Sequence, residues 1–266
     1  MDILTGSNDL GTLGLGLAIA GAVAGLMAGV LGRGAGLILV TALFLVARAA
    51  GLTPEPAIRM AIGTAFLCQV PLVLSRAATI KPSEIPRALM LPMLGGVLLS
   101  VLTTAAFVPV QVFVVAATAV IAAGLTAAVS EPHPGGNPLI QRAAALIGTA
   151  LAGLTGLSGL SLTAPLLMRS GISRAAAEAS ATVAAIAITL TGAAMAVISG
   201  WDVHGLPQHS YGYVNLLAFG IAAPLAFACQ MIGAHYAELI EAKRLRWLFA
   251  AFVIFSAARM VWSVVG

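Results

Sequence analysis

Apolar runs of about 20 residues recur along the whole chain, each long enough to span roughly 30 Å of hydrocarbon as a helix. Inside lipid the backbone must satisfy its own hydrogen bonds, and a helix does so within one segment. Of the 266 residues, 60% are hydrophobic and 8% are charged, so no stretch remains for a soluble domain. The sequence therefore predicts an all-α polytopic membrane protein.

Hydropathy and turn-forming residues divide the chain into ten segments, five in each half. The expected segments are 10–31, 35–50, 56–78, 86–107, 110–129, 140–156, 160–170, 175–199, 212–234 and 245–265. Residues 1–131 are the first transmembrane repeat, residues 132–138 are a linker rich in proline and glycine, and residues 139–266 are the second repeat.

The segment 160–170 is too short to cross a bilayer, since about 11 residues reach only roughly 16 Å as a helix. We therefore expect the first two segments of each half to form a hairpin whose glycine-rich tip lies inside the membrane. Depending on whether these broken or re-entrant helices are counted, the chain has eight to ten transmembrane segments.

Lysine and arginine gather on one side of the predicted membrane, as they do in cytoplasmic loops. With the N-terminus outside, only Arg48 and Arg59 fall in outside loops. The ten on the inside are Arg33, Arg76, Lys81, Arg87, Arg142, Arg169, Arg174, Lys243, Arg244 and Arg246. Both termini are then outside, and residues 10–31 are a retained span because no basic leader precedes them. An odd number of segments per half makes the two repeats inverted, an arrangement common in secondary transporters.

Glycines interrupt the apolar pattern at corresponding places in the two halves. The first glycine break is Gly32-Arg33-Gly34-Ala35-Gly36, and the second runs from Gly156 through Ser158 and Gly159 to Ser161. A helix that restarts after such a break points unpaired N–H groups and its positive dipole end into it, which favours anion binding. Two broken helices at matching positions are a sequence indication of a transporter site.

Arg33 offers a guanidinium suited to an oxyanion, and a charge within the membrane is usually functional. Two alternatives stay open for Arg33: snorkelling to the lipid headgroups, or a structural pair with Glu55 or another acid. Hydroxyl and amide side chains near the breaks add further donors, although small residues there also suit helix packing. The predicted substrate-binding residues are Gly32, Arg33, Gly34, Gly36, Thr64, Gln69, Gly156, Ser158, Gly159, Ser161 and Thr182.

The glycine breaks, the apolar runs after them and the small-residue stretches Ala61–Thr64 and Ala179–Thr182 resemble the TauE/SafE sulfite exporter family, also described as the 4-toluene sulfonate uptake permease family. The family motif is glycine, a hydrophobic residue and three glycines, followed by an apolar run and proline. Here Arg33 replaces an apolar residue, Ala35 and Leu160 replace glycines, and Thr41 replaces the proline that Pro165 supplies in the second copy. The resemblance implies transport of small anions, with sulfite, sulfonates and related sulfur-containing acids as the usual substrates. From the inverted halves and the membrane potential we expect a transporter of the bacterial inner membrane that exports its substrate by alternating access.

Two other readings compete with a sulfur-anion transporter. One is a permease for a non-sulfur carboxylate. The other is a rhomboid-like intramembrane serine protease, because Gly156-Leu157-Ser158-Gly159 contains the Gly-x-Ser-Gly pattern and His235 on a later helix would complete a Ser158/His235 dyad. The first half has Gly34 in the position of the serine, and a protease has no use for a duplicated glycine break. We therefore expect a transporter and no catalytic residues.

Composition narrows the partners further. The net charge is +4, and the basic residues that produce it are scattered in short loops between helices and form no nucleic-acid-binding patch. The expected partners are therefore membrane lipids and the transported anion. Cys68 and Cys229 lie in apolar segments and form no metal cluster, and no cofactor is expected. Exported negative charge gains about 2.3 kcal/mol per 100 mV, whereas uptake needs protons or another coupling ion, for which Glu178 is the main carrier and His235 a second.

Overall fold

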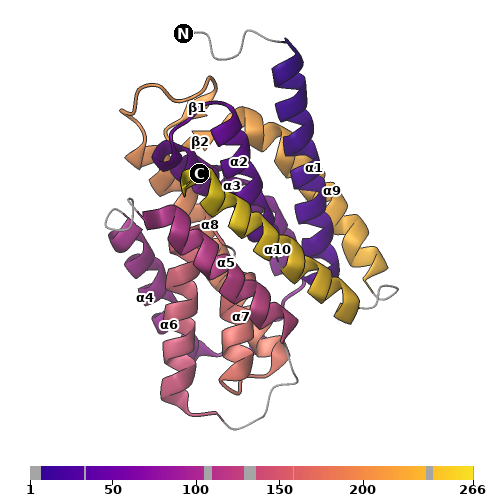
Figure 1. The fold of residues 1–266 in the computed structure, drawn as a ribbon. Helices are drawn as coiled ribbons and strands as arrows, with labels where there is room; N and C mark the ends of the chain where they lie inside the picture. The colour runs from indigo at the N-terminus through magenta and orange to yellow at the C-terminus, as the bar shows by residue number, and fades with distance from the viewer. Residues whose placement is uncertain are drawn as a thin grey trace.

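The structure is a computed structural model that describes residues 7–32, 34–104, 110–128, 136–157, 159–237 and 242–265. Over these residues it contains ten α-helices, one short 3₁₀ helix and a two-stranded hairpin (Figure 1). The elements are α1 (Ser7–Leu31), α2 (Ala35–Ala49), α3 (Pro54–Ala77), η1 (Pro82–Glu84), α4 (Arg87–Thr104), α5 (Gln111–Ala127), α6 (Pro138–Thr155), α7 (Gly159–Arg169), α8 (Arg174–Ser199), β1 (Ser210–Tyr211), β2 (Val214–Asn215), α9 (Leu216–Tyr236) and α10 (Ala242–Val265). The all-α polytopic fold predicted from hydropathy is confirmed.

Within the described residues, five helices are long and apolar enough to cross a membrane, namely α1, α3, α4, α8 and α9. Shorter apolar stretches lie in α2, α5 and α10. The helix α7 has 11 residues, as short as the sequence predicts. The protein is therefore a multi-pass membrane protein, and α7, the shortest α-helix among the described residues, cannot span the bilayer alone.

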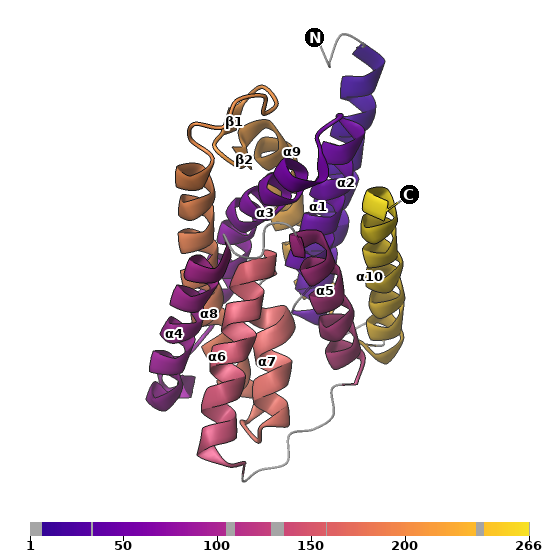
Figure 2. The ribbon, with the colours of Figure 1, turned by 60° about the vertical axis from the view of Figure 1, so that its left-hand side comes forward.

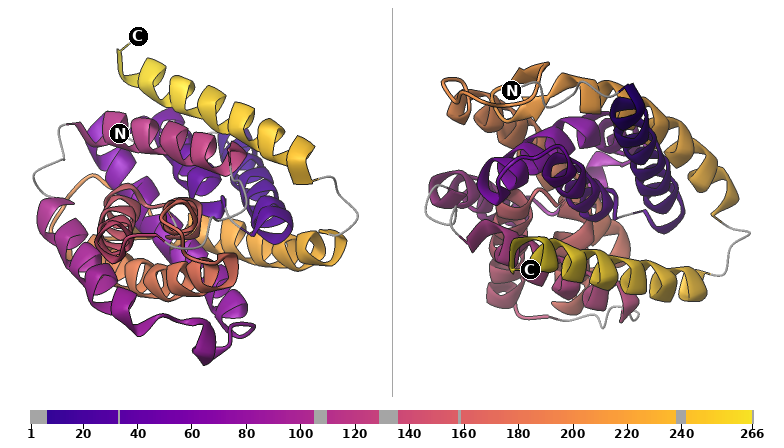
Figure 3. Two further views of the ribbon diagram at one scale, coloured as in Figure 1. Left: turned by 90° about the horizontal axis from the view of Figure 1, so that it is seen from below. Right: turned by 45° about the horizontal axis from the view of Figure 1, so that its top comes forward.

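The helix α3 forms the centre of the bundle and packs against α8. In the most apolar window of α3, 72% of the residues are buried, against 28% in α4 and in α9. The peripheral helices expose large leucines, such as Leu91 and Leu102 of α4, which suits contact with lipid. Figure 3 shows α10 lying along α5 on the outside of the bundle. The two larger cavities are lined by residues of both α3 and α8.

Helices from the two halves pack against each other in pairs. α1 of the first half lies against α9 of the second, and α6 of the second lies against α4 of the first. Both contacts need glycine, because a Cβ on Gly29 would collide with the backbone of Gln230 and one on Gly153 with the side chain of Ser100. Close approach of helices, rather than a ligand, explains these two glycines.

Polar caps fix where two helices of the second half begin. The side chain of Asn137 accepts a hydrogen bond from the Leu139 N–H at 2.9 Å, one residue before Pro138 opens α6. The side chain of Asn215 accepts from the Ala218 N–H at 2.8 Å and starts α9 directly after β2. The ninth helix therefore begins at Leu216, later than the predicted residue 212, because residues 210–215 form the β1–β2 hairpin.

The two glycine breaks turn the chain back on itself. Gly34 precedes α2 with φ of 102°, and Gly156 ends α6 with φ of 74°, conformations that glycine adopts without strain. Figure 2 shows the α1–α2 hairpin in the upper part of the molecule and the α6–α7 hairpin in the lower part. The tips of the two hairpins therefore approach each other from opposite ends.

Candidate functional site

The two glycine breaks touch. The Gly34 N–H donates a hydrogen bond of 3.1 Å to Oγ of Ser161, which is in the first turn of α7. Gly156 packs against α2, where a Cβ would lie 2.8 Å from Cγ2 of Val40. The N-terminal ends of α2 and α7 are consequently neighbours, and both place the positive ends of their dipoles at this contact.

Gln69 of α3 lies between the breaks. Its Nε2 donates to the carbonyl oxygens of Gly156 at 3.0 Å and Ala65 at 2.9 Å. Its Oε1 is buried and has no hydrogen-bond partner in the described part of the chain. Gln69 also lines a cavity of about 20 Å³ together with Gly32, Gly34 and Ala35 of the first break. The Gln69 side chain therefore connects the second glycine break to the small cavity at the first glycine break.

Arg76, also on α3, holds the first break from the other direction. Its Nη1 donates to the carbonyl oxygen of Gly32 at 2.7 Å, and its Nη2 lies 3.1 Å from Oε2 of Glu178 on α8. The second oxygen of Glu178 accepts from Nε of Arg174 at 3.1 Å. The side chains of Arg76 and Glu178 are 24% and 27% exposed, so this pair is only partly screened by water.

A larger cavity, the Arg76 cavity, lies beside this ion pair and has a volume of about 680 Å³. Arg76, Glu178 and Thr182 line it, and the exposed Thr79 connects it to the surface. Gln230 of α9 lines both this cavity and the small one, and its Oε1 is buried without a hydrogen-bond partner among the described residues. The Arg76 cavity thus leads from the surface towards the first glycine break.

The predicted substrate-binding residues do not all gather in one place. Gly32, Gly34, Gln69, Gly156 and Ser161 surround the contact between the breaks, as described above. Gly36 is buried in the first turn of α2. Gly159 packs against α8, where an added Cβ would lie 2.9 Å from the carbonyl oxygen of Ala181. Arg33 and Ser158 lie outside the described residues, so the roles predicted for them stay predictions.

The two threonines predicted at equivalent places have different surroundings. Thr182 lines the Arg76 cavity while its hydroxyl donates to the Glu178 carbonyl oxygen at 2.8 Å. Thr64 is 1% exposed and accepts a hydrogen bond from the Asn215 N–H at 3.0 Å. Thr64 therefore anchors the β1–β2 hairpin, and it lines neither the Arg76 cavity nor the small cavity at the first break.

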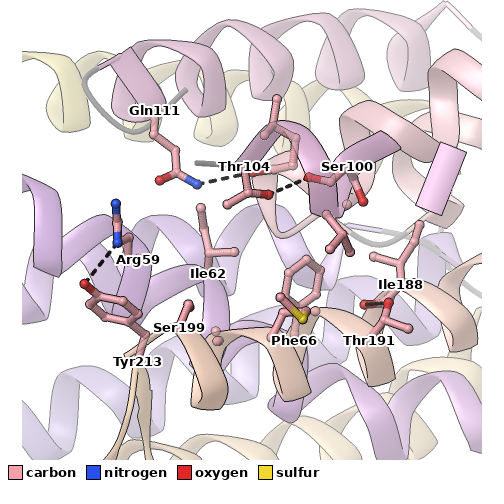
Figure 4. Close-up of a pocket in the computed structure, with 17 residues that line it drawn as sticks. Arg59, Ile62, Phe66, Ser100, Thr104, Gln111, Ile188, Thr191, Ser199 and Tyr213 are labelled. Carbon is pink, nitrogen blue, oxygen red and sulfur yellow. Dashed lines mark hydrogen bonds between the residues drawn. The ribbon is translucent and has the colours of Figure 1, made fainter. Parts of the chain in front are cut away.

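A third cavity, the Arg59 cavity, lies near the opposite end of α3 and has a volume of about 180 Å³ (Figure 4). Arg59 donates to the hydroxyl of Tyr213 at 3.1 Å and stands 5.2 Å from the centre of that ring. Gln111 opens α5 and lines the cavity, with its Nε2 directed to the Leu154 carbonyl oxygen at 3.4 Å. In Figure 4 Gln111 and Arg59 point into one space from different helices.

Sequence reasoning did not select Arg76, Arg59, Gln111 or Gln230 as site residues. The charge count assigned the two arginines to loops, but the predicted segment 56–78 contains both, and both belong to the helix α3. A spacing of 17 residues places them about 25 Å apart along that helix, one near each end. The sequence feature that could have identified them is a charged residue near the end of an otherwise apolar helix. At such a position the side chain can reach a cavity inside the protein as well as the loop outside it.

The model of the sulfite exporter TauE/SafE family matches residues 17–260, which is nearly the whole chain. The chain belongs to this family. Comparison with curated proteins gives no match. Membership makes the protein a membrane transporter of the sulfite exporter type and confirms the resemblance seen at the glycine breaks.

Membership in the TauE/SafE family also bears on the protease alternative. The proteins of this family are transporters, which fits a chain without an enzymatic role. The proposed nucleophile Ser158 lies outside the described residues, and the ring of His235 packs edge-on against Tyr236 with centroids 5.0 Å apart. A serine nucleophile would use only the second glycine break, so the protease alternative leaves the first break without a role.

Proposed function

We propose that the protein is a secondary transporter that exports sulfite, an organosulfonate or a related sulfur-containing acid by alternating access. The observation that carries this proposal is the contact between the two glycine breaks, with Arg76 bound to one and Gln69 to the other. Backbone N–H groups at two helix starts and a nearby guanidinium are the donors that an oxyanion needs inside a low-dielectric protein.

Arg76 is the cation that we assign to the anion in the Arg76 cavity. A guanidinium presents a planar fork of donors, which matches two oxygens of a sulfite or sulfonate group. In the structure one arm of that fork contacts the Glu178 carboxylate, which is itself an anion. A transported oxyanion would take the place of this carboxylate, and Glu178 would remain paired with Arg174.

The arrangement of the two halves supports alternating access. The Arg76 cavity is lined by the end of α3 and the start of α8, and the Arg59 cavity by the start of α3 and the end of α8. The neighbours also correspond, since α1 and α9 flank the first cavity and α6 and α4 flank the second. We infer an inverted repeat in which rocking of one half against the other opens each cavity in turn.

Charge sets the direction that we propose. Because the loops next to the Arg76 cavity belong to the positively charged side of the chain, we infer that this cavity faces the cytoplasm of a bacterial inner membrane and that both termini are outside. An anion leaving a negative cytoplasm gains about 2.3 kcal/mol per charge and 100 mV, so export needs no coupling ion. Proton coupling through Glu178 is the alternative if the protein works in uptake.

The test is thermal stabilisation of the detergent-purified full chain by sulfite, sulfate, thiosulfate, sulfoacetate, taurine, phosphate and acetate. A ligand that binds the folded state raises its stability. We expect selective stabilisation by a sulfur oxyanion, lost in Arg76→Gln and retained in Arg142→Gln, which removes an exposed arginine of α6. Arg33→Ala tests the sequence-based role of Arg33 in the same assay.

Each result of this panel has a defined meaning. Stabilisation by acetate but by no sulfur oxyanion would favour the carboxylate permease over the sulfur-anion transporter. Equal stabilisation of the wild type and the Arg76→Gln variant would remove Arg76 from the binding site. If no anion stabilises the wild-type protein, the anion site at the glycine breaks is wrong.

A further inference from the structure

We propose that the Arg59 cavity is a second anion-binding station, separate from the glycine breaks, for a monovalent organic oxyanion with a compact apolar group. The inference rests on the proposed transport function and assigns the substrate a binding place at the opposite end of α3. The Arg59 guanidinium would hold the charged head, and the walls of the cavity would hold the apolar group.

The charge in this cavity comes from a single residue. Among the described residues that line it, Arg59 alone is charged. Its side chain is 25% exposed and pairs at 3.3 Å with Glu55, whose side chain is 60% exposed. An ion pair this accessible to water is weak, so Glu55 neutralises Arg59 much less than a buried carboxylate would. An incoming anion can replace it at little cost.

The position of the Arg59 guanidinium is fixed by Tyr213. The phenol oxygen accepts its hydrogen bond, and the face of the ring adds a cation–π contact. Tyr213 is itself held by a hydrogen bond from its backbone N–H to the Ala196 carbonyl oxygen at 2.9 Å. Nε of Arg59 is buried and finds no hydrogen-bond partner in the described structure. The guanidinium is thus oriented with donor capacity left over for a ligand.

The remaining walls are mostly apolar. Ile62 and Phe66 follow Arg59 on one face of α3, and Ile188 and Met195 face them from α8. Three of the hydroxyls on these walls donate to carbonyl oxygens of their own helices, so they add little polarity; they are Ser100, Thr104 and Thr191. An inorganic dianion would lose its hydration against these walls without replacement, whereas an apolar group is accommodated.

The volume and one unpaired amide oxygen also point to a ligand. A cavity of about 150 Å³ lined by apolar side chains suffices for a benzene molecule, and the Arg59 cavity measures about 180 Å³. Gln111 is 2% exposed, lines the cavity, and its Oε1 has no hydrogen-bond partner among the described residues. A water that accompanies the bound anion would donate to this buried acceptor and to the anion at once.

The experiment measures protection of a cysteine in this cavity from a membrane-impermeant thiol reagent, with benzenesulfonate as the probe. Ser199→Cys is introduced into the full chain after Cys68 and Cys229 are replaced by alanine, since Ser199 lines the cavity and is exposed. In proteoliposomes we expect benzenesulfonate to slow the labelling at least tenfold and sulfate to slow it less than twofold. Arg59→Gln should abolish the protection, Arg59→Lys should retain part of it, and Arg142→Gln should leave it unchanged.

The outcomes separate this inference from the function on which it rests. If benzenesulfonate or another sulfonate stabilises the protein thermally but does not protect the thiol introduced by Ser199→Cys, the second station is wrong and the transporter proposal stands. Equal protection in the wild-type background and in a folded Arg59→Gln variant would also overturn the station. If no anion stabilises or protects the protein, the proposed function fails together with it.

Discussion

The two ends of α3 carry the same residue type in different settings. At one end Arg76 joins the Gly32 carbonyl oxygen to Glu178, whose side chain is 27% exposed, and so connects the first glycine break to α8. At the other end Arg59 contacts a phenol and Glu55, whose side chain is 60% exposed. Arg76 is part of a network that crosses three elements, whereas Arg59 stands at the edge of a largely apolar cavity.

This difference suggests different roles in transport for the two arginines. Binding an anion at Arg76 means displacing a partly buried carboxylate, and this couples binding to the contact between α3 and α8. Binding at Arg59 replaces only a weak surface pair and leaves the helix contacts intact. We infer that the Arg59 cavity receives or releases the substrate, while the Arg76 cavity couples its binding to the conformational change.

The largest expected effect comes from removing the charge at the networked end. Arg76→Gln should lower the affinity for the stabilising anion by about tenfold to a hundredfold, because a charge-assisted hydrogen bond contributes about 1.5–3 kcal/mol. Isothermal titration of the purified variant measures this change, with Arg142→Gln as the charge-matched control. An affinity within twofold of the wild type would contradict the role of Arg76 in anion binding.

The second prediction concerns the glycine break that lies between the two ends. Gly156→Ala should lower the free energy of unfolding by about 1–3 kcal/mol, because alanine is strained at φ of 74° and its Cβ would press on Val40. The control is Gly124→Ala in α5, where an added Cβ meets no atom within 4 Å. Thermal unfolding followed by circular dichroism compares the two variants. An equal melting temperature for both would show that the break tolerates a side chain.

Neutralising the carboxylate partner of each arginine, Glu178 or Glu55, should affect anion binding differently at the two ends of α3. Glu178→Gln should raise anion affinity about two- to fivefold, since it removes a partly exposed competing carboxylate whose pair with Arg76 contributes about 0.5–1 kcal/mol. Glu55→Gln should change the benzenesulfonate protection of the Arg59 cavity by less than twofold, because Glu55 is largely in solvent. The same titration and labelling assays apply. A larger effect from Glu55→Gln would reverse the assignment of the weak and the networked pair.

The smallest expected effect is at Tyr213. Tyr213→Phe keeps the ring beneath the guanidinium and removes only the hydroxyl, so benzenesulfonate protection at Arg59 should weaken about two- to threefold, as expected for one ordinary hydrogen bond of about 0.5 kcal/mol. The thiol-labelling rate measures it. Loss of all protection would mean that the hydroxyl contacts the ligand directly, and Tyr213 would then be a binding residue.

Much of the fold could be predicted because its determinants are local. Apolar run lengths placed the ten helices, and the short segment after the second break appeared as the 11-residue α7. The β1–β2 hairpin was missed because it depends on distant partners, among them the Thr64 hydroxyl and the Ala196 carbonyl oxygen. Gln69 was selected from its spacing along α3, but the hydrogen bond to Gly156 that defines its position joins residues 87 apart in the chain.

The sequence by itself determined that this chain is helical, lies in a membrane and breaks two of its helices at glycines, because hydropathy and backbone freedom are properties of the residues themselves. The family resemblance rested on the same glycines. Only the tertiary structure decided which cations reach the cavities. Arg59 and Arg76 are equally basic in the sequence, and their different settings come from Glu178, Tyr213 and Gly32, which the packing of α3 against its neighbours brings within hydrogen-bonding distance.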